Sequence, residues 1–409
     1  METQPEKALH QAPKSKGTYE TRPETLEIEQ PHQKLRIGVP KEEFMQENRV
    51  ALVPSAVSSL VANGHRVIVQ KGAGKKANYS NRDYAEVGAE LTDSKEEVFK
   101  SAFLVKVAPC TREEINLLHP QQVLFSPLQI PLIDREYIIA LQKKKVIAIA
   151  MEYLMDRDGS FPIVRIMSEM AGLSAILTAA KLLTHKEGGN GVLLGGISGV
   201  PPAKVVILGA GVVGEFATRT AVGLGAEVRI FDNNIYKLMR IQHRIGRQLY
   251  TSALNPVFLK REIENADVVI GAIHSKTGRS PVVVTEDMVE KMKKGSVIID
   301  VSIDQGGCIE TSRITTHDRP TFEKHGVLHY CVPNIASSVP RTASVAISNI
   351  LIPILIRAGE THNLQNLFSR DSGLRHGVYI YKGLLTNAYL SEVFKLKYTN
   401  LELLITSGW

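Results

Sequence analysis

The segment from Lys204 to Asp232 constrains the fold of this chain more than any other. Four apolar residues, Val205–Leu208, predict a strand that is buried on both faces. The turn Gly209–Gly214 has the spacing GxGxxG, and the residues that follow it predict a helix. A second predicted strand, Ala226–Phe231, comes next. Strand, glycine turn, helix and strand in this order are typical of a βαβ unit that binds a dinucleotide.

Each part of this motif has a physical role in holding a dinucleotide. Gly209 permits the tight turn, Gly211 lets backbone amides approach the pyrophosphate, and Gly214 lets the helix pack closely on the strand. The helix N-terminus offers free N–H groups and a positive dipole end to the phosphates. Asp232, about 20 residues on, is expected to bind both ribose hydroxyls and to repel a 2′-phosphate. The motif therefore predicts NAD rather than NADP; the alternative is a glycine-rich turn with no ligand.

Length and hydropathy limit the class of protein. At 409 residues the chain is too long for one core and indicates two or three domains. Its 44% hydrophobic and 22% charged residues are ordinary for a soluble globular protein. The longest apolar stretch, Val345–Ile356, is interrupted by Ser348, Asn349 and Pro353, so we expect no membrane span. The N-terminus lacks the apolar core of a signal peptide.

Charge and cysteine content exclude further classes. The net charge is +7, but the positive residues are scattered in short runs without interleaved aromatics, so we expect no nucleic-acid binding. Cys110, Cys308 and Cys331 are widely spaced and form neither a disulfide framework nor a zinc pattern. We therefore expect a cytoplasmic protein without a bound metal.

The pattern of strands and helices predicts the domain organisation. Residues 1–34 are polar and lack apolar periodicity, which predicts a disordered tail without a catalytic role. Residues 35–162 alternate between strands and helices and predict an α/β domain with a mostly parallel sheet, which residues 341–409 complete. Residues 163–340 predict the dinucleotide-binding domain. The expected fold class is therefore α/β, with two Rossmann-like doubly wound domains joined by long helices.

Four element assignments depend directly on local sequence. Pro162–Leu183 and Ser338–Ala358 are long and largely apolar, and they predict the two helices between the domains. We also expect a helix over Tyr84–Leu91 in the first domain. In the second domain, His329–Val332 is the strand expected to close the sheet.

Seven strings carry a resemblance to a known family. They are Arg36–Glu42, Asn48–Ala51, Met167–Gly172, Gly209–Gly214, Ile303–Cys308, Tyr330–Asn334 and Tyr381–Asn387. Together they resemble the alanine dehydrogenase family, which is related to the NAD-binding subunit of proton-translocating transhydrogenase. The string Asp-Gln-Gly-Gly-Cys at 304–308 favours the dehydrogenase. The resemblance implies oxidative deamination of L-alanine to pyruvate and ammonium, with hydride transfer to NAD, by a homo-oligomer such as a hexamer.

The resemblance also implies roles for individual residues. Arg49 matches the family's carboxylate-binding arginine, and a planar fork suits that ligand. Asp304 matches the acid beside the nicotinamide, Asn334 would hold substrate and nicotinamide, and Ser168 would contact the pyrophosphate. The remaining implied cofactor contacts are Gly209, Gly211, Val212, Val213, Gly214, Asp232, Lys237, Ser252, Ala272, Ile273, Val301, Ile303, Val332 and Ile335.

Two positions depart from the family's pattern. A lysine and a histidine of the family are replaced here by Ala108 and Gln129. Gln129 can hydrogen-bond a carbonyl but cannot act as a general acid or base at neutral pH. In a strand, Lys106 would point the same way as Ala108 from about 6.6 Å away, which makes it a candidate to contact substrate. The catalytic candidates are therefore Asp304, Gln129 and Lys106.

Three functions remain open on these residues. The first is an amino-acid dehydrogenase with altered proton-transfer residues, which the retained Arg49 and Asp304 favour. The second is a transhydrogenase-like NAD(H)-binding protein without an amino-acid substrate, and the third is a non-catalytic NAD-bound protein. Ala108 and Gln129 favour the second and third functions.

Overall fold

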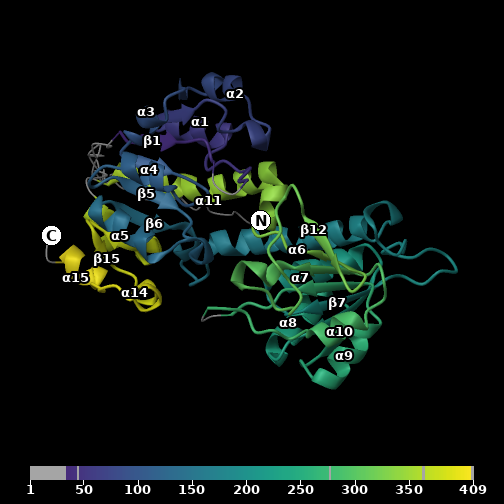
Figure 1. Ribbon diagram of the computed structural model, residues 1–409. Helices are drawn as coiled ribbons and strands as arrows, with labels where there is room; N and C mark the ends of the chain where they lie inside the picture. The colour runs from purple at the N-terminus through teal and green to yellow at the C-terminus, as the bar shows by residue number, and fades with distance from the viewer. Residues whose placement is uncertain (1–33, 44–45, 276–277, 362–363, 407–409) are drawn as a thin grey trace, which may run out of the picture. The chain divides into compact units, whose positions relative to one another are not determined.

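The computed structural model describes residues 34–43, 46–275, 278–361 and 364–406. The predicted tail therefore lies almost entirely outside the described residues. Within them, two sheets are formed, each parallel over most of its width (Figure 1). The first sheet has the order β15-β14-β6-β5-β4-β1-β2-β3. Its strands are β1 (Arg36–Val39), β2 (Arg66–Gln70), β3 (Glu90–Thr92), β4 (Phe103–Val105), β5 (Val123–Ser126), β6 (Ile147–Ala150), β14 (Val378–Tyr381) and β15 (Leu384–Leu385).

The second sheet contains the glycine motif and has the order β12-β13-β11-β10-β7-β8-β9. Its strands are β7 (Lys204–Leu208), β8 (Glu227–Phe231), β9 (Tyr250–Ser252), β10 (Val268–Gly271), β11 (Val297–Asp300), β12 (Thr321–Lys324) and β13 (Val327–Tyr330). Only β12 runs antiparallel to its neighbour in this sheet, as β14 and β15 do in the first. The central strands consist mostly of buried apolar residues, as expected for strands covered on both faces.

Helices separate the strands along the chain. The longer ones are α1 (Pro54–Ala62), α5 (Arg135–Lys143), α6 (Pro162–Leu182), α7 (Val212–Gly223), α8 (Ile235–Ile245), α9 (Pro256–Glu264) and α11 (Pro340–Glu360). The shorter ones are α2 (Asn81–Glu86), α3 (Lys95–Phe99), α4 (Arg112–Leu117), α10 (Glu286–Glu290), α12 (Leu364–Arg370), α13 (Ser372–Gly377), α14 (Ala388–Phe394) and α15 (Leu401–Thr406). In both sheets the strand order reverses beside the first strand, so both are doubly wound and the predicted fold class is confirmed.

Two of the sequence-based element assignments need correction. The expected helix over Tyr84–Leu91 ends early, because Gly88 adopts a φ of +87° and the chain then enters the edge strand β3. The segment around His329 does not close the second sheet, because β12 forms a hairpin with β13 and takes the edge position. The short edge strands have weak apolar patterns, and their pairing depends on a neighbour that is already in place.

The two predicted long helices are present as α6 and α11, each beginning with a proline at its first position. By length and hydropathy alone, both could cross a membrane. About half of each apolar window is buried inside the protein, 44% for α6 and 50% for α11. Core helices of α/β proteins pass the same test, so these helices are weak evidence for a membrane span.

Helix α6 packs closely on α7 at Gly172. A Cβ added at Gly172 would lie 2.4 Å from the carbonyl oxygen of Val213 and 2.8 Å from the amide nitrogen of Ala217. Both are backbone atoms of α7, which cannot rotate away. A glycine is therefore required at position 172, because α6 and α7 lie too close together here for any side chain.

We expect Gly172→Ala to destabilise the protein by about 1–3 kcal/mol through overpacking. Gly223→Ala is the matched control, because Gly223 lies on α7 with no heavy atom within 4 Å of its added Cβ. The control should be neutral or stabilising by up to about 1 kcal/mol, since alanine has the higher helix propensity. Urea unfolding curves of both variants measure the difference, and equal stabilities would contradict the close-packing explanation.

Candidate active site

The candidate site lies where polar residues follow the carboxyl ends of strands. In the first sheet the strand order reverses between β1 and β4, which is where ligands bind in doubly wound sheets. The segment containing Arg49 follows β1, and the segment Lys106–Ala108 follows β4. Two serines of α11 fix the Arg49 segment: the Val50 N–H donates to Ser344 Oγ at 2.9 Å, and the Val53 N–H donates to Ser348 Oγ at 3.0 Å.

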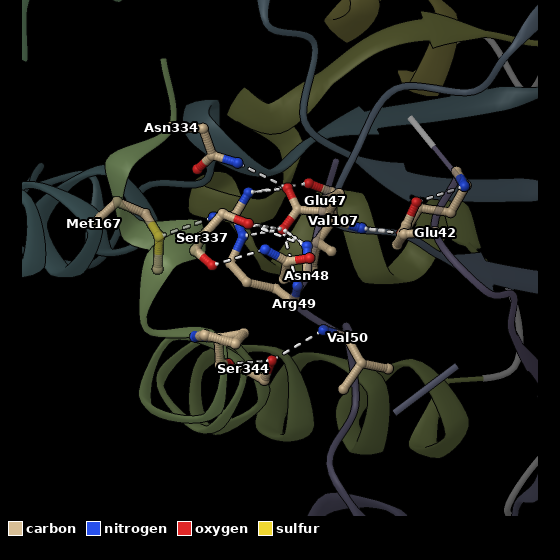
Figure 2. Close-up of polar contacts among 12 residues, drawn as sticks. Glu42, Glu47, Asn48, Arg49, Val50, Val107, Met167, Asn334, Ser337 and Ser344 are labelled. Carbon is tan, nitrogen blue, oxygen red and sulfur yellow. Dashed lines mark hydrogen bonds and ion pairs between the residues drawn. The ribbon is translucent and has the colours of Figure 1, made fainter. Parts of the chain in front are cut away.

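Arg49 is buried and forms a two-pronged ion pair with Glu47. Its Nε donates to Glu47 Oε1 at 2.7 Å and its Nη2 donates to Glu47 Oε2 at 2.6 Å (Figure 2). Arg49 is only 5% exposed and Glu47 only 3% exposed. Burial by itself would raise the pKa of Glu47, but the charge and hydrogen bonds of Arg49 outweigh it, and the pKa is lowered. One edge of the guanidinium therefore already holds a carboxylate.

The other edge of Arg49 has weak partners. Its Nη1 contacts the sulfur of Met167 at 3.1 Å, and its Nη2 lies 3.4 Å from the carbonyl oxygen of Val107. A thioether is a poor acceptor, and methionine is flexible. A ligand carboxylate would form stronger hydrogen bonds with this edge than Met167 does. Arg49 can therefore bind a carboxylate while Glu47 holds it in place.

Glu47 also links Arg49 to the segment after β13. Asn334 Nδ2 donates to Glu47 Oε2 at 2.8 Å, and Ser337 Oγ donates to Glu47 Oε1 at 3.1 Å (Figure 2). The backbone N–H of Asn334 then donates to Asp304 Oδ1 at 3.2 Å. Asn334 has a φ of +57°, so the chain bends sharply here. Glu47 thus joins Arg49 to Asn334, and the Asn334 backbone joins this pair to Asp304; all three were predicted from the sequence as site residues.

Asp304 lies in the 3₁₀ turn η5 (Val301–Gln305), directly after β11. Its side chain reaches solvent, yet protein atoms surround it closely. This desolvation raises the pKa of Asp304 to about 6, although the Asn334 N–H and the charge of Arg49 oppose the shift. Asp304 can therefore change its protonation state near neutral pH.

Lys106 occupies a buried ion cluster. Its Nζ donates to Glu42 Oε2 at 2.8 Å and to Glu114 Oε1 at 3.1 Å, and its side chain is 1% exposed. Burial would lower the pKa of Lys106, but the two carboxylates outweigh it and raise the pKa. The second oxygen of Glu42 accepts the Val107 N–H at 2.6 Å. These contacts favour a structural role for Lys106 and give no support to the predicted contact with substrate.

Gln129 is held in an unusual conformation by a residue that sequence reasoning missed. Gln129 has a φ of +47°, and Glu152 Oε1 accepts the N–H groups of Leu128 at 2.8 Å and Gln129 at 3.1 Å. Glu152 follows β6, and burial raises its pKa. Ala108 is buried, with 1% exposure. Glu47 was missed as well, although its spacing two residues before Arg49 places both side chains on one face of an extended chain.

The glycine turn after β7 has the geometry that a dinucleotide phosphate requires. Gly209 has a φ of +107°, and a Cβ at Gly214 would lie 1.9 Å from the Gly209 carbonyl oxygen. No side chain caps the N-terminus of α7, and a Cβ at Gly211 would meet no atom within 4 Å. The first N–H groups of α7, including those of Val212 and Val213, are therefore presented to a ligand.

The other predicted cofactor contacts fall mostly at the carboxyl ends of strands. Ala272 and Ile273 follow β10, Val301 and Ile303 follow β11, Val332 and Ile335 follow β13, and Ser252 ends β9. Ile303, Val332 and Ile335 are buried, so we expect them to offer backbone atoms to a ligand. Ser168 lies partly exposed on α6, and Lys237 lies on α8.

Asp232 braces the glycine turn. Its Oδ2 accepts the Ala210 N–H at 2.7 Å, its Oδ1 accepts the Asn234 N–H at 2.7 Å, and Lys237 Nζ lies 3.9 Å from Oδ2. These bonds fix the carboxylate at the end of β8, where the ribose of a bound dinucleotide is expected. We expect NAD(H) to bind at least about tenfold more tightly than NADP(H), equivalent to about 1.4 kcal/mol. Calorimetric titration with both cofactors measures this, and equal affinities would contradict the role of Asp232.

One group of side chains has the spacing of a metal site. Within the described residues, ligand atoms of Glu286, Glu290 and His325 all lie within 4.8 Å of one another. Glu286 already pairs with Lys324 at 2.7 Å and with His325 at 2.7 Å. Exposed ion pairs of this kind are common without a metal, and we assign no metal site here.

Comparison with known proteins agrees with this geometry. The family model "Alanine dehydrogenase/PNT, N-terminal domain" matches residues 38–171, and "Alanine dehydrogenase/PNT, C-terminal domain" matches residues 175–388. The chain belongs to the alanine dehydrogenase/PNT family. The resemblance predicted from the sequence is therefore confirmed.

Members of the alanine dehydrogenase/PNT family resemble the chain over most of its length. Alanine dehydrogenase 2 of Staphylococcus aureus strain USA300 is 39% identical over 369 residues, which cover 90% of this chain and 99% of the relative. A solved L-alanine dehydrogenase has a TM-score of 0.84 at 37% identity, covering 88% of this chain and 99% of that one. A transhydrogenase from Sinorhizobium meliloti, with a TM-score of 0.74 and 24% identity over 86% of this chain and 99% of that one, shares the fold.

Proposed function

We propose that this protein catalyses the NAD-dependent oxidative deamination of L-alanine to pyruvate and ammonium. The observation that carries the proposal is the hydrogen-bonded series from Arg49 through Glu47 and Asn334 to Asp304. This series connects a buried arginine to an acid with a raised pKa, which supports a shared site for a substrate that carries a carboxylate. The family assignment supports NAD as the cofactor.

Each residue of the series has a chemical task in this reaction. The free edge of Arg49 binds the substrate carboxylate, displacing the Met167 sulfur. The Asp304 carboxylate stabilises the positive charge of the imine and orients the water that attacks it. The glycine turn would hold NAD, and the bound nicotinamide would supply the hydride acceptor for the substrate α-carbon. Glu47 keeps Arg49 and Asn334 in register, which preserves the orientation of substrate toward cofactor.

The alternative is a transhydrogenase-like protein that binds NAD(H) and takes no amino acid. Ala108 and Gln129 favour this alternative, because both lack a group that transfers protons. Arg49 and Asp304 favour the dehydrogenase, because cofactor binding alone requires neither. We further propose that the protein works as a homo-oligomer, which light scattering on the purified protein measures.

The deciding experiment measures NAD reduction by the purified protein with a panel of L-amino acids. We expect turnover with L-alanine and formation of equal amounts of NADH and pyruvate. A parallel assay follows hydride exchange between NADH and an oxidised NAD analogue without an amino acid. Exchange without any amino-acid turnover would establish the alternative and exclude the dehydrogenase.

A further inference from the structure

His317 lies on the loop between β11 and β12 and is fixed beside the Arg49–Glu47 pair. Its backbone N–H donates to Gln46 Oε1 at 3.1 Å, and the Gln46 amide also donates to the carboxylate of Asp318. The loop is tied to the end of β13, because the Thr315 N–H donates to the Cys331 carbonyl oxygen at 3.0 Å. His317 is therefore held between the residue before Glu47 and the segment that leads to Asn334.

The imidazole of His317 lies close enough to charged groups of the candidate site to feel their fields. It interacts with the charges of Glu47, Asp318 and Arg49 and with the backbone of Asn334. Its Nε2 is buried, and within the described residues no group meets this atom at hydrogen-bonding distance and angle. By contrast, the ring of His329 has a partner at each nitrogen, Thr311 and Val327. His317 thus has a buried ring nitrogen available for another group.

We propose that His317 is the proton-transfer residue of this site and supplies what Ala108 and Gln129 lack. The inference rests on the proposed function. An imidazole is the side chain best suited to proton exchange near neutral pH. His317 lies on a loop between two strands of the second sheet. Positions 108 and 129, by contrast, follow strands of the first sheet.

The substrate ammonium gives one proton to the His317 Nε2, and its α-carbon gives a hydride to NAD. The electron pair left on nitrogen forms the C=N bond, so the products are the iminium form of pyruvate, NADH and an imidazolium. Glu47 and Asp318 stabilise the imidazolium, since the negative charge of each carboxylate raises the pKa of the ring.

The protonation state of His317 at pH 7 suits this role. Partial burial lowers its pKa below 6.5; Glu47, Asp318 and the Asn334 backbone oppose this shift, and Arg49 adds to it. The ring is then neutral at pH 7 and able to accept a proton. Lowering the pH protonates the ring and removes the base, so deamination should decrease at acid pH. Asp304 has a pKa of about 6, which is close to that of an imidazole. Variants of His317 are therefore needed to assign the acid limb of the pH profile to one of the two residues.

The test compares His317→Gln and His317→Ala with wild type, using His185→Gln on an exposed turn as the control. We expect both His317 variants to lower kcat by about 10²- to 10⁴-fold, the usual effect of losing a general acid or base. The affinity for NADH, measured by calorimetry, should be unchanged. Added imidazole should restore turnover to His317→Ala in proportion to its concentration, and it should have no effect on wild type or on the control. A merely structural role would show no such rescue.

Three outcomes separate the proposal from the proposed function. If wild type reduces NAD with L-alanine and His317→Gln retains kcat and the acid limb of the pH profile, the role of His317 is excluded. Low activity without imidazole rescue, together with reduced NADH affinity or melting temperature, also excludes it. If wild type is inactive with every amino acid, the proposed function itself fails, and the role of His317 falls with it.

Discussion

Replacing Arg49 by alanine is expected to raise the KM for the amino acid strongly and to destabilise the fold at the same time. Loss of a buried, hydrogen-bonded charge contact costs about 2–5 kcal/mol of substrate binding. At 1.4 kcal/mol for each tenfold change, this corresponds to about 30- to 4,000-fold in KM. The KM of Arg49→Lys should lie between those of wild type and Arg49→Ala, because lysine keeps the charge but lacks the planar fork of arginine. The affinity for NADH should stay unchanged, because NADH is expected to bind at the glycine turn after β7 in the second sheet, whereas Arg49 follows β1 in the first sheet.

The stability effect has a separate cause, which a second variant isolates. Arg49→Ala leaves Glu47 buried without a cation, a change that typically costs about 3–5 kcal/mol. The double variant Arg49→Ala with Glu47→Ala removes both charges and should recover much of the stability without restoring substrate binding. Urea unfolding and steady-state kinetics on the same samples separate the two effects. Equal stability of single and double variants would contradict the buried ion pair.

The pH dependence of stability gives an independent check on this pair. In wild type the pKa of Glu47 is lowered from 4.5, so its stabilising effect is complete above 4.5 and is lost as the pH falls through the lowered value. In Arg49→Ala, burial without the cation raises the pKa of Glu47. Lowering the pH from 7 towards 5 should therefore stabilise the variant through protonation of Glu47. Loss of stability in the variant over this range would contradict the assignment.

In the His317→Gln background, restoring the family's residues by Ala108→Lys together with Gln129→His is expected to raise kcat/KM by about one to three orders of magnitude, because each adds a group that can transfer protons. At position 129, Glu152 Oε1 already accepts the backbone N–H. Its Oε2 has no hydrogen-bond partner within the described residues and could accept a hydrogen bond from the new imidazole of Gln129→His. Ala108→Lys must place a charge at a position that is 1% exposed, and we expect a lower melting temperature from it.

The single variants show which position limits the reaction. If His317 already transfers the proton, Gln129→His should add little to wild type and should restore much of the activity of His317→Gln. Kinetics on Gln129→His, Ala108→Lys and the double variant, each in both backgrounds, measure this directly. No gain in any background would show that positions 108 and 129 do not limit this enzyme.

The sequence determined the fold class and predicted the glycine turn that is expected to hold the cofactor, because both depend on local patterns. Val205–Leu208, Gly209–Gly214 and Asp232 are contiguous, and each residue type follows from the backbone conformation that it must adopt or from the ligand that it must meet. The long helices α6 and α11 were also predictable, because their apolar composition and length exceed those of any strand. The family resemblance pointed to Arg49 through the string Asn48–Ala51 and to Asp304 through the string Ile303–Cys308.

The tertiary structure decided which residues meet. Glu47 and Asn334 are 287 positions apart in the chain, and their hydrogen bond exists only because segments following β1 and β13 come together. Strand alternation suggested that Lys106 faces substrate, but Glu42 and Glu114 pair with it in the core, and their approach has no signal in the sequence around Lys106. His317 is also distant from Glu47 in sequence. Contacts of this kind depend on the path of the whole chain, whereas strands, turns and helices depend on neighbours within a few residues.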